Sequence, residues 1–202
     1  MGVMIDGVWH ATEPKTNGKD GAFKRPETAF RNWITADGSA GPIGGGGFKA
    51  EPGRYHLYVC HACPWAHRAM IFRVLKGLED VISVSVVHWI MAENGWNFAD
   101  GEGVIPDPVI GADYLYQLYQ HADANFSGRI TVPVLWDLKR NTIVNNESSE
   151  IIRMFNSAFN AFAKHPKLDF YPEDLHSEIE PINKRIYHTL NNGVYRSGFA
   201  RS

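Results

Sequence analysis

The sequence lacks the features that would assign it at once to a membrane, secreted or nucleic-acid-binding class. No apolar run approaches the roughly 18 residues of a membrane-spanning helix. The first residues, MGVMIDGVWHATEP, have neither the positive region nor the apolar run of a signal peptide. Neither sign of charge dominates, because 20 Lys and Arg stand against 22 Asp and Glu. The sequence therefore predicts a cytoplasmic protein with no membrane or nucleic-acid partner.

Cysteine is also scarce, since the chain has only Cys60 and Cys63, both in the stretch CHACPWAHR. Two cysteines exclude an extensive disulfide framework, and the lack of an export signal favours a reducing compartment. In that setting a thiol is reactive, bound to a metal or inert. With 44% hydrophobic residues, the 202-residue chain can build the core of one large domain, or of one domain and a fragment.

The first half of the chain predicts a βαβ unit behind an irregular start. Residues 1–50 are rich in Gly and Pro and predict an irregular N-terminal extension. RYHLYV at 54–59 alternates as a strand does, and VISVSVV at 81–87 predicts a second strand. Between them lies a predicted helix that stops at Gly77 and has three apolar residues at helical spacing, namely Ala69, Phe72 and Leu75.

The segment from 113 to about 160 predicts a helix, two strands and another helix. DYLYQLYQHA at 113–122 is helical, with an apolar face formed by Leu115, Leu118 and Tyr119. TVPVLWD at 131–137 and TIV at 142–144 predict short strands. Ser148 or Asn146 is the predicted cap of the helix that follows. Residues 51–160 therefore predict an α/β domain.

The last part of the chain, residues 161–202, predicts a linker and the beginning of a helical domain. An amphipathic helix is expected over 173–191, and Pro181 within it predicts a kink. Its apolar stripe consists of Leu175, Ile179, Ile182, Ile186 and Leu190.

Cys63 occupies a position that activates a thiol. A helix N-terminus offers free N–H groups and the positive end of the helix dipole, and both favour thiolate. Pro64 fits the first helical turn because it lacks the N–H that would be unpaired there. This register puts Cys63 at the helix N-terminus and Cys60 at the end of the strand. Cys63 is therefore the predicted nucleophile.

Two other interpretations of the stretch stay open. The C-x-x-C spacing also permits a working disulfide between Cys60 and Cys63. Cys60, His61, Cys63 and His67 could supply metal ligands, but a structural zinc takes its ligand pairs from two separated segments. The sequence has no second Cys/His cluster, so we predict no metal site.

The motifs FRNWI, CPWAHR, NGW, GRITVPVLWD, NESSEIIRMFN and IYHTLNNGVY, in this order, resemble the glutathionyl-hydroquinone reductases, or Xi-class glutathione transferases. The resemblance covers essentially the whole chain. It implies a thioredoxin-like N-terminal domain of order βαβ-ββα, followed by the all-α C-terminal domain of a glutathione transferase. Family members are longer and dimeric, so it also implies that this chain ends after the first helix of the domain that forms most dimer contacts.

The resemblance also implies roles for individual residues. Cys63 attacks the glutathionyl sulfur, and Pro133 is expected in the cis form, which turns the Val132 backbone toward the cysteinyl part of glutathione. Glu147 and Ser148 match the residues that bind the γ-glutamyl end. The remaining matches are Trp96 and Arg129, which hold the rest of the peptide, and Tyr195, which faces the hydroquinone.

Each of these residues also has an ordinary structural interpretation. Pro133 could be a trans turn residue, and Glu147 with Ser148 could be only a helix cap. Trp96 could be a core or lid aromatic, Arg129 a surface charge, and Tyr195 a side chain near a loosely held chain end.

The implied activity is glutathione-dependent reduction of S-glutathionyl hydroquinones through a Cys63–glutathione mixed disulfide, with release of oxidised glutathione. Glutathione is then the co-substrate, and the partners are glutathione and its aromatic conjugates. A general glutathione-dependent thiol transferase uses the same mixed disulfide and is one alternative. A glutathione-binding remnant without catalysis is the other.

Overall fold

The computed structural model describes residues 2–12 and 27–199, which belong to two compact units. The first unit comprises Met1–Glu13 and Thr28–Leu168, and the second comprises Pro14–Glu27 and Asp169–Ser202. Residues 13–26 of the predicted N-terminal extension lie outside the described residues. Among the residues that are described, no helix is both long and apolar enough to cross a membrane.

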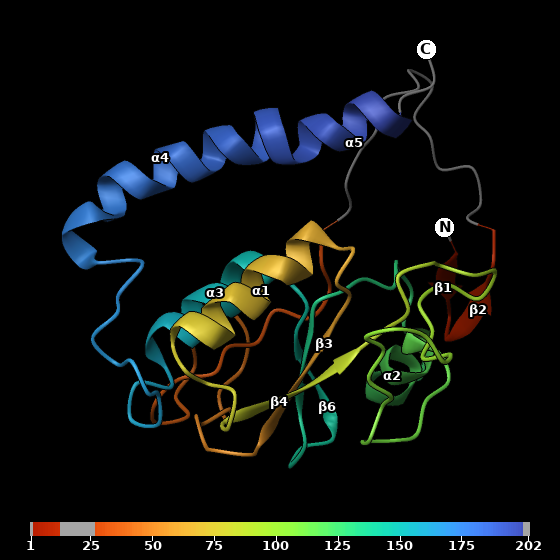
Figure 1. Cartoon of the computed structure of the whole chain (residues 1–202), viewed down its shortest axis with the longest axis horizontal. Coiled ribbons are helices and arrows are strands. Elements are labelled where there is room, and N and C mark those ends of the chain that lie inside the picture. The colour runs from red at the N-terminus through yellow and green to blue at the C-terminus, as the bar shows by residue number, and fades with distance from the viewer. Residues whose placement is uncertain (1, 13–26, 200–202) are drawn as a thin grey trace. The chain divides into compact units, whose positions relative to one another are not determined.

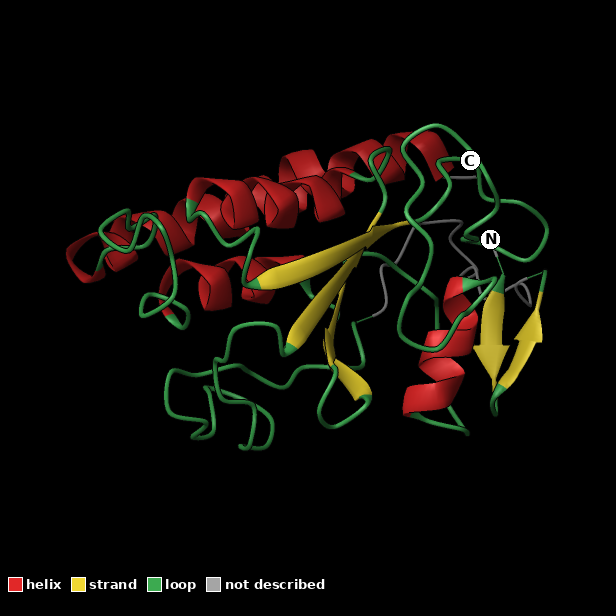
Figure 2. Ribbon diagram, turned by 60° about the horizontal axis from the view of Figure 1, so that its bottom comes forward, coloured by secondary structure: helices red, strands yellow, loops and turns green. Residues whose placement is uncertain are grey.

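A four-stranded mixed sheet forms the centre of the first unit (Figure 2). Its strands are β3 (Tyr55–Val59), β4 (Ile82–Val86), β5 (Val134–Asp137) and β6 (Thr142–Asn145). Their order in the sheet is β4-β3-β5-β6, with β3 and β4 parallel and the other pairs antiparallel. Helix α1 (Pro64–Leu75) joins β3 to β4, and α3 (Ser148–Ser157) follows β6, so the predicted βαβ-ββα order is confirmed.

Helices cover both faces of this sheet. Figure 1 shows α1 and α3 side by side on one face and α2 (Leu115–Ala122) on the other. The predicted face of α2 is confirmed, because Leu115, Leu118 and Tyr119 are its buried residues.

Strand β3 is more buried than its sequence pattern predicts. Alternating side chains suggest one solvent-facing side, yet all five residues are buried because β3 lies inside the sheet and helices cover both faces. The polar side chain of His56 is accommodated by Ser83 Oγ, 2.7 Å from Nδ1, and Ser85 Oγ, 2.9 Å from Nε2. Burial lowers the pKa of His56 to about 4, so its ring is neutral at pH 7.

Helix α1 begins at Pro64 as predicted, and Gly77 follows its C-terminal cap. Its buried face differs from the prediction, since Leu75 is exposed while the stem of Arg73 is buried. The Arg73 guanidinium donates to the carbonyls of Ile82 at 2.7 Å and Glu79 at 3.0 Å, which compensates its burial.

We expect Gly77→Ala to lower the free energy of unfolding by about 1 to 3 kcal/mol more than Gly53→Ala does. Both glycines have a positive φ, +66° and +70°. Alanine in this left-handed backbone conformation therefore has a similar energetic cost at both positions. A Cβ at Gly77 would lie 2.5 Å from Lys164 Cβ, whereas a Cβ at Gly53 would meet nothing within 4 Å. Urea unfolding followed by tryptophan fluorescence measures the difference, and equal losses would contradict the steric explanation.

The predicted irregular extension contains a hairpin. Strands β1 (Val3–Ile5) and β2 (Val8–His10) pair antiparallel around Asp6 and Gly7, whose φ angles are +47° and +76°. Two positive φ angles define the turn that suits a tight hairpin, and Asp-Gly is a favoured sequence for it. The sequence therefore held a hairpin signal that the Gly- and Pro-rich composition of residues 1–50 obscured.

Both outer strands of the sheet have a neighbouring segment. At β6, Arg31 pairs antiparallel with Asn145, and the Asn32 N–H donates to the Val144 carbonyl at 3.0 Å. At β4, Val86 and Ile105 exchange two backbone hydrogen bonds of 3.0 Å each.

The second unit is helical where it is described. After the 3-10 turn η1 (Glu173–Leu175) come α4 (His176–Ile186), the π-helical turn η2 (Tyr187–Asn191) and α5 (Asn192–Phe199). Helix α4 continues through Pro181, and the kink expected there stays a prediction. Most of the predicted apolar stripe is exposed, namely Leu175, Ile182, Ile186 and Leu190, while Ile179 is half-buried.

Candidate active site

The topology of the sheet brings several predicted residues to one edge. Parallel strands β3 and β4 end at this edge, antiparallel β5 begins there, and β6 ends there. Cys60 follows β3, Pro133 precedes β5, and Glu147 comes after β6. Residues that are far apart in the sequence are therefore positioned at the same side of the fold.

Cys63 is the N-cap residue of α1, with extended backbone angles of φ −99° and ψ 114°. Its half-buried thiol donates to the Val132 carbonyl over 3.7 Å. The Val132–Pro133 bond is cis, which confirms that prediction. The thiol at the N-terminus of α1 thus lies beside the backbone that precedes β5.

Cys60 has a different environment. It is 1% exposed, and its thiol points to the His88 carbonyl over 3.9 Å. Burial raises the pKa of the Cys60 thiol, which disfavours its thiolate. Both cysteines are free thiols, and only Cys63 is at a helix N-terminus and partly accessible. This arrangement favours Cys63 as the nucleophile.

The metal interpretation of this stretch has no geometric support. His61 and His67 are exposed, whereas Cys60 is buried. Across residues 2–12 and 27–199, no three His, Cys, Asp or Glu side chains gather in a way that could hold a metal ion.

The cap of α3 is Glu147, so the prediction of Ser148 or Asn146 was wrong. The Glu147 carboxylate accepts from the Ser149 N–H at 3.1 Å, and its carbonyl accepts from the Glu150 N–H at 3.0 Å. Ser148 is instead the first residue of the helix and is 3% exposed. The capping role of Glu147 is therefore established by geometry, whether or not it also binds a ligand.

Arg68 is a residue of this site that the sequence interpretation missed. Its Nε and Nη2 donate to Ser148 Oγ at 3.0 and 2.8 Å, and Nη2 lies 3.6 Å from Glu147 Oε1. The available signal was its spacing, because Arg68 follows Pro64 by four residues and shares its side of α1. Arg68 thus links the helix that begins after Cys63 to the start of α3.

Hydrogen bonds from the N-terminal extension hold the start of α3. Asn145 accepts from the Glu147 N–H at 2.7 Å and donates to Glu150 at 2.8 Å. Arg31 Nε donates to the same Glu150 carboxylate at 2.7 Å, and Thr28 Oγ1 donates to Glu147 at 3.4 Å. The segment containing Thr28 and Arg31 therefore supports the residues predicted to bind the γ-glutamyl end.

Trp96 and Arg129 are half-buried in two loops, of which the first is bonded to α2 and the second to the hairpin β1–β2. The Trp96 carbonyl accepts from the Leu115 N–H at 2.9 Å. Gly128, next to Arg129, exchanges two backbone hydrogen bonds of 2.9 Å with Met4 of β1. The structure thereby places both residues in ordered loops, and their contacts with a ligand stay a prediction.

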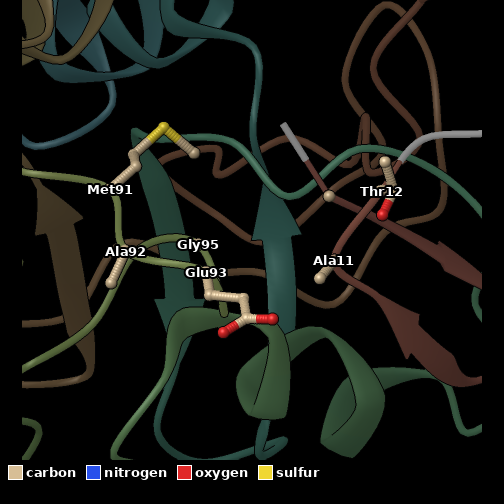
Figure 3. A pocket seen from close by; sticks show the side chains of 7 residues that line it. Ala11, Thr12, Met91, Ala92, Glu93 and Gly95 are labelled. Carbon is tan, nitrogen blue, oxygen red and sulfur yellow. The ribbon is translucent and has the colours of Figure 1, made fainter.

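A cavity of about 270 Å³ lies between the hairpin and the loop before Trp96. Figure 3 shows Ala11 and Thr12 on one side and Met91, Ala92, Glu93 and Gly95 on the other. Gly2 completes the lining, in which Glu93 is the one charged residue. None of the predicted site residues lines this cavity, so it is a neighbour of the candidate site and not the site itself.

Tyr195 lies on α5 of the second unit and is half-buried. Its expected role, to face the hydroquinone, stays a prediction.

Sequence comparisons link the chain to proteins of known class. Residues 62–158 match the family "Glutathione S-transferase, N-terminal domain". Glutathionyl-hydroquinone reductase YqjG of Escherichia coli (strain K12) is 58% identical over 203 residues, covering 100% of this chain and 62% of that protein. Glutathionyl-hydroquinone reductase PcpF of Sphingobium chlorophenolicum is 53% identical over 200 residues, covering 99% and 60%. The chain thus spans 62% and 60% of the length of these curated relatives.

Solved structures agree with the sequence comparison. The glutathione-bound structure of YqjG matches with a TM-score of 0.88 at 56% identity, over 100% of this chain and 59% of that one. A Xi-class glutathione transferase from Natrialba magadii matches with a TM-score of 0.87 at 48% identity, over 100% and 58%. The Saccharomyces cerevisiae Xi transferase ECM4, in complex with glutathione, matches with a TM-score of 0.80 at 40% identity, over 90% and 60%.

Proposed function

Because this chain belongs to the glutathione S-transferase superfamily, and its homologues are Xi-class transferases and glutathionyl-hydroquinone reductases, we propose that it reduces S-glutathionyl hydroquinones with glutathione. Its thioredoxin-like N-terminal domain is shared with those proteins. The reaction and its substrates are carried over from relatives that are longer than this chain.

The observation that carries the proposal is the position of the Cys63 thiol, at the N-terminus of α1 and 3.7 Å from the Val132 carbonyl. The helix terminus favours thiolate, which is the nucleophilic form. The backbone at Val132 is the part of the fold that would pair with the cysteinyl unit of glutathione. A bound glutathione would then present its sulfur to Cys63.

The start of α3 suits the other end of glutathione. Glu147 and Arg68 place a carboxylate and a guanidinium 3.6 Å apart, beside the helix N-terminus. The γ-glutamyl end carries an α-amino group and an α-carboxylate, so these charges complement each other. We assign Trp96 and Arg129 to the remaining contacts with the peptide, as the resemblance implies.

The chemistry is two successive displacements at sulfur. The Cys63 thiolate attacks the glutathionyl sulfur, a sulfur–sulfur bond forms, and the bond from sulfur to the aromatic carbon breaks. That carbon keeps the electron pair and takes a proton, for which Tyr195 is the proposed donor. A second glutathione thiolate then attacks the mixed disulfide, which releases oxidised glutathione and restores the Cys63 thiolate. Over the cycle, one glutathione thiol and the thioether sulfur of the substrate are oxidised to the disulfide, and the aromatic carbon is reduced by two electrons.

A general glutathione-dependent thiol transferase is the second candidate, because its cycle needs the same mixed disulfide. The free thiols of Cys60 and Cys63 agree with a reducing compartment, and we propose the cytoplasm for either activity.

A steady-state assay with two substrates tests the proposal. We expect turnover of a glutathionylated hydroquinone with glutathione as the reductant, measured by chromatography of the released hydroquinone. A small glutathione mixed disulfide serves as the comparison substrate. Turnover of the disulfide alone would favour the thiol transferase, and turnover of neither would leave a glutathione-binding protein without this chemistry.

A further inference from the structure

The guanidinium of Arg68 is one of the accessible polar groups at the start of α3. Ser148 is 3% exposed, whereas the side chains of Arg68 and Glu147 are 29% and 26% exposed. Arg68 reaches this position from α1, and its guanidinium carbon lies 5.1 Å from the centre of the Trp65 ring. A ligand that approaches the helix N-terminus therefore reaches Arg68 and Glu147 before it reaches the Ser148 hydroxyl.

The hydrogen bonds of Ser148 orient both partners. Ser148 Oγ accepts from Nε at 3.0 Å and from Nη2 at 2.8 Å, which uses both of its lone pairs. The hydroxyl hydrogen must then point away from Arg68, so Ser148 is available only as a donor. The two bonds also fix the plane of the guanidinium and occupy its Nε/Nη2 side, so a carboxylate would meet the Nη1/Nη2 end of the rigid fork.

We propose that Arg68 recognises the α-carboxylate of the γ-glutamyl end of glutathione, next to Glu147, which takes the α-amino group. Ser148 holds the guanidinium in place and can donate its own hydrogen to the same carboxylate. Arg68 is thus a specificity-determining residue. The pair Arg68–Glu147 selects ligands that end in an amino acid with both a free amino group and a free carboxylate. This inference rests on the proposed function, because it assumes that glutathione is the ligand.

The test compares reduced glutathione with an analogue in which 4-aminobutanoyl replaces the γ-glutamyl group. The analogue keeps the thiol and the amino group but lacks the α-carboxylate. We expect the wild-type chain to bind glutathione about ten- to a hundredfold more tightly than the analogue, as measured by titration calorimetry. Arg68→Met should weaken glutathione binding by a similar factor and change the affinity for the analogue by less than about twofold.

Two further variants separate recognition from folding. Arg68→Lys keeps the charge but loses the fork, so its glutathione affinity should fall between those of the wild type and Arg68→Met. Arg140→Met is the matched control, because Arg140 also stacks on an aromatic ring, that of Phe48, but lies in the turn between β5 and β6, at the opposite sheet edge. It should bind both ligands as the wild type does.

Undiminished preference for glutathione in Arg68→Met would overturn this inference and leave the proposed function standing. Failure of the wild-type chain to bind glutathione would overturn both. If glutathione binds and the predicted discrimination is found, but no hydroquinone is released in the two-substrate assay, the proposed function fails while the assignment of Arg68 holds.

Discussion

Cys63→Ser is expected to lower turnover of a glutathionylated substrate by on the order of a thousandfold or more, while Cys60→Ser keeps most of the activity. The reason is the different environment of the two thiols. Cys63 begins α1 and is partly accessible, whereas Cys60 is 1% exposed and its pKa is raised by burial. A serine hydroxyl at position 63 stays protonated at neutral pH and cannot replace a thiolate.

Mass spectrometry provides the second measurement for this prediction. After incubation with oxidised glutathione, the wild-type chain should carry one adduct of glutathione mass on Cys63, and so should Cys60→Ser. An adduct on Cys60, or a Cys60–Cys63 disulfide that the cycle requires, would refute the assignment of a single nucleophile.

Asp137→Ala is expected to lower the free energy of unfolding by about 3 to 5 kcal/mol. Asp137 is fully buried at the end of β5, and its carboxylate pairs with Arg54 through bonds of 3.0 and 2.5 Å. Arg54 is itself 7% exposed, so removal of the carboxylate leaves a buried charge whose other carboxylate partner, Glu51, is 3.7 Å away and partly exposed. Asp137 also accepts from the N–H of Lys139 at 2.9 Å, which closes the turn to β6. Such a loss is a large part of the about 5 to 15 kcal/mol that stabilises a typical domain.

Glu51→Gln is the matched control for that experiment. Glu51 lies 3.7 Å from Arg54, but its side chain is 28% exposed and also pairs with the exposed Lys139. Because solvent screens such a pair, the loss for Glu51→Gln should stay below about 1 kcal/mol. Urea unfolding followed by tryptophan fluorescence measures the free energy of unfolding of both variants. Equal losses for the two variants would mean that the Arg54–Asp137 pair contributes no more than a surface ion pair.

Local signals determined which parts of the structure could be predicted. The register of Pro64 located Cys63 at the start of α1, and the apolar spacing of residues 115–119 gave the buried face of α2. The burial of both sides of β3 depends on the order of strands in the sheet, which the alternation within one strand does not contain. The cap at Glu147 was missed because Ser and Asn are more frequent caps, and here Ser148 is engaged by a side chain from another helix.

The residues of the candidate site also divide into those that the sequence could predict and those that depend on partners far away in the sequence. The cis bond before Pro133 followed from the family resemblance and is present in the structure. Arg68 could not be assigned from its own neighbours in the sequence, because its partners Glu147 and Ser148 are about 80 residues away. The part that Thr28 and Arg31 take in holding α3 was hidden for the same reason, since the segment looks irregular until its partner strand is known.

The segments that flank the sheet affect whether two molecules of this protein can associate through their outer strands. An outer strand with unpaired backbone groups is a template for strand addition from another molecule, and amyloid-like growth begins there. In this fold Asn32 already donates to the backbone of β6, and Ile105 exchanges hydrogen bonds with β4. At those positions the backbone groups are engaged within the chain, which protects the sheet from intermolecular pairing. The N-terminal extension, which contains Asn32, thus also reduces aggregation through the outer edge of β6.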